Sequence, residues 1–152
     1  MAKRNSSTTT SAQKWERETS DYFALRIDAA RSVLWMLVQS IEDNFASDGR
    51  ATDEAICLSL QHVTNEILQL ERLSYELDRP ESADCGDLSL KLMWARALGE
   101  AMGDMFSTSE WKITLGDEIL CGNLQSMARL LDEAYREAVN VHKVKFPAYS
   151  AL

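Results

Sequence analysis

Residues 23–41 read FALRIDAARSVLWMLVQSI, and apolar side chains recur through them at alternating steps of four and three residues. The repeating positions are Phe23, Ile27, Ala30, Leu34, Leu37 and Ile41. This spacing lines up side chains along one side of an α-helix and is typical of helices packed in bundles. We therefore predict a helix over about Asp21–Ala46, with Ser20 as its N-cap and Ser47-Asp48-Gly49 at its end.

Two further segments repeat this spacing. In the segment over about Asp53–Asp78, with Thr52 as its N-cap, the stripe consists of Ile56, Leu60, Val63, Ile67, Leu70 and Leu77, with Ser74 at the one polar position. In the segment over about Asp117–Lys145, it consists of Leu120, Leu124, Met127, Leu131, Ala134, Ala138 and Val141. Both segments are predicted to be amphipathic helices with one buried side.

A fourth helix is predicted over about Leu88–Phe106, with Asp87 as its cap. Its predicted stripe consists of Leu90, Trp94, Ala97 or Leu98, Ala101 and Met105. Gly99 and Gly103 lie one turn apart, which indicates either close approach of a neighbouring helix or a weak helix end.

Residues 107–116 fit more than one structure. Ser107 and Glu110 match a capping box that would start the last helix early. Residues 111–115 alternate in polarity like a short strand, and Gly116 interrupts either arrangement.

Together these patterns predict an all-α protein, an antiparallel bundle of about four helices formed by residues 20–152. Residues 1–19 are expected to form a flexible polar tail, because their Ser/Thr-rich run lacks an apolar period. We expect neither a secretory signal nor a membrane span, since no apolar stretch is long enough.

Negative charge is concentrated in one part of the chain. Residues 42–87 hold twelve acids and three bases, a net charge of −9, whereas the remaining residues hold twelve acids and thirteen bases, +1. This balance disfavours nucleic acid or an anionic membrane as a direct partner. It fits either a solvated face or a surface that docks a basic protein, for which Glu66, Glu71 and Glu76 are the candidate residues.

The three cysteines form no CxxC pair, which favours reduced thiols and a cytoplasmic location. Cys57 and Cys121 lie in apolar helical patterns and are expected in the core. We expect no metal and no cofactor, because His62 has no matching ligand pair and no phosphate-binding glycine motif occurs.

Two apolar runs exceed what one buried stripe requires. Residues 33–38 and 92–95 are apolar on more than one helical face, so they are either central in the packing or exposed to another chain. The candidate partner-binding residues are Trp35, Met36, Val38, Met93 and Trp94. The expected function is therefore non-enzymatic: a homo-oligomer, or a bundle that docks a protein partner.

Two other functions stay open. Arg136 precedes His142 by six residues on a late helix, which resembles the R-x(4–6)-H motif of HEPN ribonucleases, small helical bundles that are often dimeric. The resemblance implies action of both residues on an RNA backbone, but acidic Glu137 replaces the polar residue that usually follows the arginine. The other alternative is an acidic inhibitor, of a kind that phages encode, which occupies a nucleic-acid-binding protein.

Overall fold

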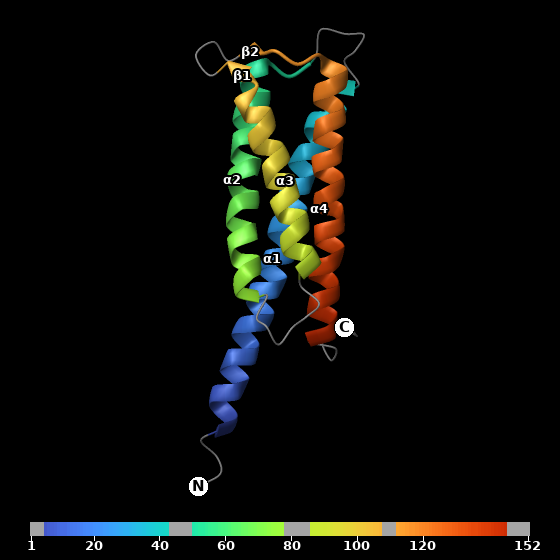
Figure 1. The fold of residues 1–152 in the computed structure, drawn as a ribbon. Coiled ribbons are helices and arrows are strands. Elements are labelled where there is room, and N and C mark those ends of the chain that lie inside the picture. The colour runs from blue at the N-terminus through green and yellow to red at the C-terminus, as the bar shows by residue number, and fades with distance from the viewer. Residues whose placement is uncertain (1–4, 43–49, 78–85, 108–111, 146–152) are drawn as a thin grey trace.

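The computed structural model describes the backbone of residues 5–42, 50–77, 86–107 and 112–145, and the side chains of 23–42, 50–75, 88–106 and 112–140. The elements within these ranges are α1 (Asn5–Glu42), α2 (Asp53–Leu77), α3 (Gly86–Asp104), β1 (Phe106–Ser107), β2 (Lys112–Ile113) and α4 (Asp117–Lys145). They confirm the predicted all-α class (Figure 1).

The four helices run alternately up and down, as the short connections between them require (Figure 1). α1 packs against α4 and α2, and α3 also packs against α2 and α4. α1 and α3 therefore occupy opposite corners of the bundle, and every neighbouring pair of helices is antiparallel.

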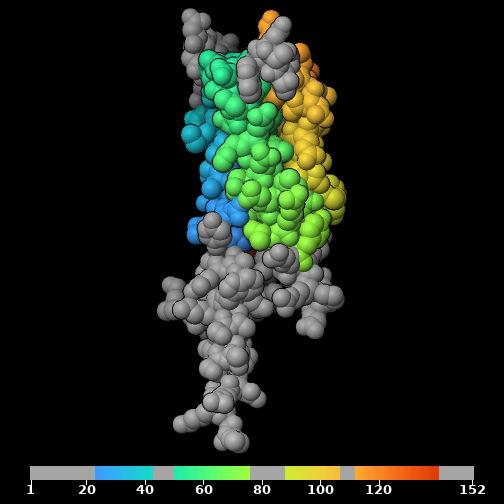
Figure 2. All heavy atoms as spheres, turned by 90° about the vertical axis from the view of Figure 1, so that its left-hand side faces the viewer, coloured from blue at the N-terminus to red at the C-terminus, as the bar shows by residue number. Residues whose placement is uncertain are grey.

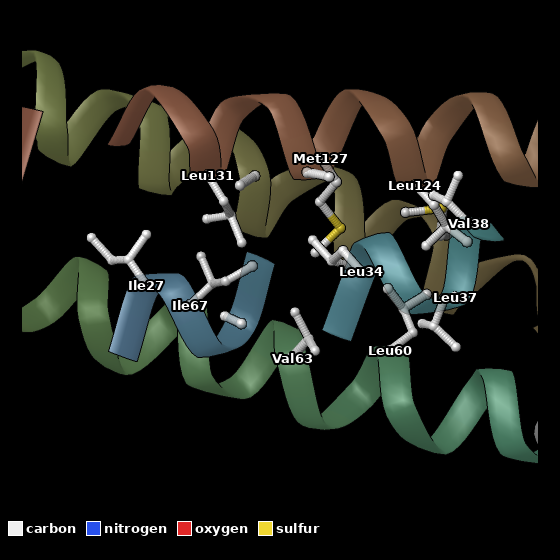
Figure 3. Packing of buried hydrophobic residues seen from close by; sticks show 14 of the residues in the cluster. Ile27, Leu34, Leu37, Val38, Leu60, Val63, Ile67, Leu124, Met127 and Leu131 are labelled. Atoms are coloured by element: carbon white, nitrogen blue, oxygen red, sulfur yellow. The ribbon is translucent and has the colours of Figure 1, made fainter. Parts of the chain in front are cut away.

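The predicted stripes of α1, α2 and α4 are confirmed as the core. All of their described members are buried, and Figure 3 shows Ile27, Leu34, Ile67, Leu124 and Leu131 converging from these three helices. Leu77 and Val141 lie outside the described side chains. Burial of each large aliphatic side chain contributes about 1.5–3 kcal/mol to folding, so these stripes supply much of the stability.

The stripe predicted for α3 is wrong. The side that faces the core consists of Leu88, Leu92, Ala95, Gly99, Met102 and, just beyond the helix, Phe106. Both sides of α3 carry apolar residues at the same four-three spacing, so periodicity alone did not distinguish them.

Gly99 contributes a close helix–helix contact to this inner side of α3. A Cβ at this position would overlap the hydroxyl oxygen of Thr64 on α2 and lie 2.9 Å from Cε of Met127 on α4. A Cβ at Gly103 would meet nothing within 4 Å. The close-approach interpretation is therefore confirmed for Gly99 and wrong for Gly103.

The N-terminal end of α1 differs from the prediction. The helix begins at Asn5, so Ser20 is an interior residue and not an N-cap, and residues 5–19 continue α1 past the ends of its neighbours (Figure 1). Extending an existing helix costs far less than nucleating one, and residues 12–18 include several strong helix formers. The flexibility expected of this segment stays a prediction.

Between α3 and α4 the chain forms a short antiparallel hairpin, with Phe106 opposite Ile113 and Ser107 opposite Lys112. The strand interpretation is thus confirmed at 112–113, and α4 starts at Asp117 instead of at the capping box. An Asp53 carboxylate oxygen at the start of α2 accepts a hydrogen bond from the Ile113 N–H at 3.2 Å, which ties the hairpin to the bundle.

Candidate functional site

The apolar run of α1 mostly faces inward. Val38, predicted to contact a partner, is only 2% exposed and lies beside Leu124 in the core (Figure 3). Trp35 is partly buried, and its indole N–H points at Asp132 of α4 at a donor–acceptor distance of 3.4 Å. α1 buries a wide face because it packs against two neighbouring helices. Of the three candidate contact residues on this helix, Trp35, Met36 and Val38, only Met36 is largely exposed, at 69%.

The side of α3 that points away from the bundle carries a second apolar stripe, beside the exposed acids Glu100 and Asp104. We call this stripe the outer face of α3; it consists of Leu90, Trp94, Ala97, Ala101 and, directly after the helix, Met105. Trp94 is 45% exposed and Met105 51%, both alanines are exposed, and Leu90 is partly buried. α3 thus carries two apolar stripes on opposite sides, and its own bundle covers one of them.

Charged residues lie along the two edges of this outer face. On the α4 side, the Lys91 ammonium pairs with Glu133 at 2.5 Å and lies 5.4 Å from the Trp94 ring centroid. On the α2 side, Arg96 pairs with Glu71 and Glu100. Met93, the other predicted contact residue on this helix, is partly buried.

The acidic side chains predicted on α2 act largely within the fold. Glu71 is only 5% exposed and accepts hydrogen bonds from Arg96 of α3 and from the Tyr75 hydroxyl, so its placement on a solvated face is wrong. Hydrogen bonds to Glu71 and then Glu100 raise the pKa of Arg96 above its ordinary value. A carboxylate at a core-flanking position of α2 is tolerated because α3 supplies this guanidinium.

Glu66 is also engaged, because Arg26 of α1 donates to it through Nε at 3.2 Å and Nη2 at 3.0 Å. The side chain of Glu76 lies outside the described residues. The charged surface that helix α2 offers to a basic partner is therefore smaller than its sequence indicates.

A buried polar contact that the sequence did not reveal joins α2 to α3. The hydroxyl groups of Ser74 and Ser89 lie 2.8 Å apart, and Ser74 also donates to the Glu71 carbonyl oxygen at 2.6 Å. The only signal was Ser74, the one polar position in an apolar stripe. This contact fixes the register of α3 against α2, because sliding either helix would leave both hydroxyls buried without each other.

The candidate enzymatic residues are not brought into a site within the described structure. Arg136 is exposed on α4, and the side chain of His142 lies outside the described residues, so the ribonuclease interpretation stays a prediction. Cys57 and Cys121 are buried and free, as predicted. Burial and then nearby Glu42 raise the pKa of Cys121 to about 11, which keeps its thiol protonated and poorly nucleophilic.

In the part of the chain that the structure describes, no three His, Cys, Asp or Glu side chains gather as a possible metal site. No described helix has the combination of length and apolarity that a membrane span requires. The outer face of α3 is therefore the strongest candidate for function among the described surfaces. No protein-family model, curated protein or solved structure matches this chain.

Proposed function

We propose that this protein is a non-enzymatic interaction module that self-associates through the outer face of α3. One observation carries the proposal: Leu90, Trp94, Ala97 and Ala101 of α3, with Met105 directly after the helix, form an apolar stripe that its own bundle does not cover, beside the exposed acids Glu100 and Asp104. A helix packed on one side of a bundle needs only one apolar stripe, so a second stripe on the opposite side exceeds what its own fold requires. Solvent exposure of such a stripe is typical of a surface that another protein covers.

A second copy of this chain is the partner that suits this face. The large residues Trp94 and Met105 lie on either side of the small residues Ala97 and Ala101, and Leu90 lies one turn before Trp94. In an antiparallel pair with a twofold axis between the alanines, Trp94 of one copy would meet Met105 of the second copy. Sulfur–aromatic contacts are favourable, and the alanines let the two helices approach closely, so the face is complementary to itself.

Met36 does not extend this surface, because it belongs to α1 at the opposite corner of the bundle. The outward positions of α1 are also interrupted by polar Ser32 and Gln39. The proposal therefore narrows the sequence-based expectation from two helices to α3 alone.

Sedimentation equilibrium at micromolar concentration tests the proposal. We expect a dimer for the wild-type chain and a folded monomer for Ala101→Glu, since a charge at the centre of an apolar contact is strongly unfavourable. Ser126→Glu on the outward side of α4 and Met36→Glu on α1 are the matched controls and should remain dimeric. A monomeric wild-type chain, or equal association of all four proteins, would contradict the assignment.

A further inference from the structure

Among the described residues, Ile119 is the one large apolar side chain that α4 leaves exposed, and it is 59% exposed. It lies in the first turn of this helix, whose outward positions are mostly polar or charged. A single exposed apolar residue is ordinary on a protein surface. The place of Ile119 relative to the outer face of α3 gives it a meaning.

The ion pair between α3 and α4 shows which residues of these antiparallel helices lie at the same level. Lys91 of α3 pairs with Glu133 of α4 at 2.5 Å. Met105 follows Lys91 by fourteen residues and Ile119 precedes Glu133 by fourteen, which is close to four helical turns in each case. The Met105 N–H donates to the Met102 carbonyl oxygen at 3.1 Å, so the winding of α3 continues to this residue. Met105 and Ile119 therefore lie level with each other at the outer edge of the α3–α4 boundary.

We call these two residues the Met105–Ile119 patch; Met105 is 51% exposed and Ile119 59%. α4 occupies the corner of the bundle opposite α2, the helix that lies in front in Figure 2, so α2 does not contribute to this patch. Trp94 of the same chain does not cover it either, because Trp94 precedes Met105 by eleven residues, about 16 Å along α3. The patch is thus an apolar surface that its own bundle leaves open.

We propose that the Met105–Ile119 patch receives the Trp94 indole of a second copy of this chain. The inference rests on the proposed self-association and adds one residue of α4 to it. In the antiparallel dimer, Trp94 of one copy lies opposite Met105 of the second copy, and Ile119 then flanks the ring on the α4 side. The indole gains an aliphatic contact beside the sulfur contact.

The arrangement suits a twofold contact, because each copy presents an indole on one side of the two alanines and the patch on the other. Symmetry then forms the same contact twice. A parallel pair of α3 helices would place Trp94 opposite Trp94 and leave Ile119 uncovered. Ile119 therefore favours the antiparallel arrangement over the parallel one.

Sedimentation equilibrium of the full-length Ile119→Glu variant tests the inference. A glutamate in the first turn of a helix is favoured by the helix dipole, so the monomer should stay folded and its circular dichroism melt should not weaken. Covering this carboxylate with an indole is unfavourable, so the dissociation constant of the dimer should rise at least about tenfold. Leu25→Glu, the same change at a 66% exposed aliphatic residue of α1, is the matched control and should leave the dissociation constant unchanged.

Truncation separates a direct contact from a general effect of charge. Trp94→Ala and Ile119→Ala should each weaken the dimer, and the double variant should weaken it by less than the product of the two effects, because the two side chains share one contact. A monomeric wild-type chain would overturn the self-association and this inference together. If Ala101→Glu abolishes the dimer while Ile119→Glu associates like wild type, the self-association stands and the contact of Ile119 is wrong. Effects of Trp94→Ala and Ile119→Ala that multiply in full would also overturn the contact.

Discussion

α3 and α4 pack against each other, yet the sides that they turn away from the bundle differ. The outward positions of α4 are Gly122, Ser126, Arg129, Glu133, Arg136 and Asn140, which are mostly polar or charged. The outer face of α3 is an apolar stripe, although the exposed acids Glu100 and Asp104 lie beside it. α4 is complete as a surface helix of one bundle, whereas α3 has the composition of a helix covered on both sides.

This difference shows why the same sequence rule worked for one helix and not for its neighbour. In α4, only one side is apolar, so the buried side follows from the spacing. In α3, two stripes fit the spacing equally well, and the predicted one is exposed. The ambiguity itself is informative, because a second apolar stripe has no role within the bundle and points to a contact outside it.

The largest expected effect is the difference in stability between charge substitutions on the buried and the exposed side of α3. Ala95→Glu would bury a carboxylate in the core and should lower the free energy of unfolding by more than about 3 kcal/mol. Ala97→Glu, two residues away on the outer face, should change the stability of the monomer by less than about 0.5 kcal/mol. Urea unfolding at low protein concentration measures both. Similar destabilisation by the two substitutions would show that α3 does not have one free side.

The next prediction compares how much the ion pairs on the two edges of α3 contribute to the free energy of unfolding. Glu71→Ala should cost about 2–4 kcal/mol, because it leaves Arg96 without its main partner in a largely buried position. Glu133→Ala removes the partner of Lys91, but this carboxylate is half exposed and its loss should cost under about 1 kcal/mol. Chemical denaturation gives both values. A larger loss of stability in Glu133→Ala than in Glu71→Ala would contradict the greater contribution assigned to the Glu71–Arg96 pair.

A third comparison concerns the two glycines of α3. Gly99→Ala should destabilise the fold by about 1–3 kcal/mol, because the new methyl group overlaps Thr64 and approaches Met127. Gly103→Ala enters open space and should stabilise the helix by up to about 1 kcal/mol. Thermal unfolding followed by circular dichroism distinguishes the two. The same sign of change at both positions would contradict the close contact assigned to Gly99.

The smallest expected effect on stability concerns the ion pairs of Arg50 near the start of α4. Arg50 pairs with Asp53 of α2 and Asp117 of α4. Burial alone would raise the pKa of Asp53, but hydrogen bonds from Arg50 and the Ile113 N–H outweigh it and lower the pKa below the usual 3.8. Asp53 therefore contributes stability that is present above pH 3.8 and is lost as pH falls through the lowered value.

Because Asp53 and Arg50 are both partly exposed, the contribution should be under about 1 kcal/mol. Thermal melts of wild type and Asp53→Asn should differ at neutral pH and converge in acid. A constant difference across the pH range would exclude the titration of Asp53 as its source.

The exposure of the candidate partner-binding residues was predictable only in part. Trp94, which was predicted both as a member of the buried stripe and as a candidate contact residue, is 45% exposed, so the first prediction is wrong and the second stays a prediction. Val38 belonged to an equally apolar run and proved to be core, since α1 contacts two helices there. Glu71 looked like part of an acidic surface, because its partner Arg96 lies 25 residues away and the pairing arises only when α2 and α3 pack.

The sequence by itself determined the helical class, the three amphipathic helices and their buried sides, because a period of 3.6 residues and the hydrophobic effect act locally along the chain. Only the tertiary structure decided which stripe of α3 is inside and which acids are paired. Each of these depends on a side chain from another helix: Thr64 and Met127 against Gly99, and Arg96 against Glu71. Contacts between distant segments leave no periodic signal in either segment, so packing alone selects among arrangements that the pattern permits equally.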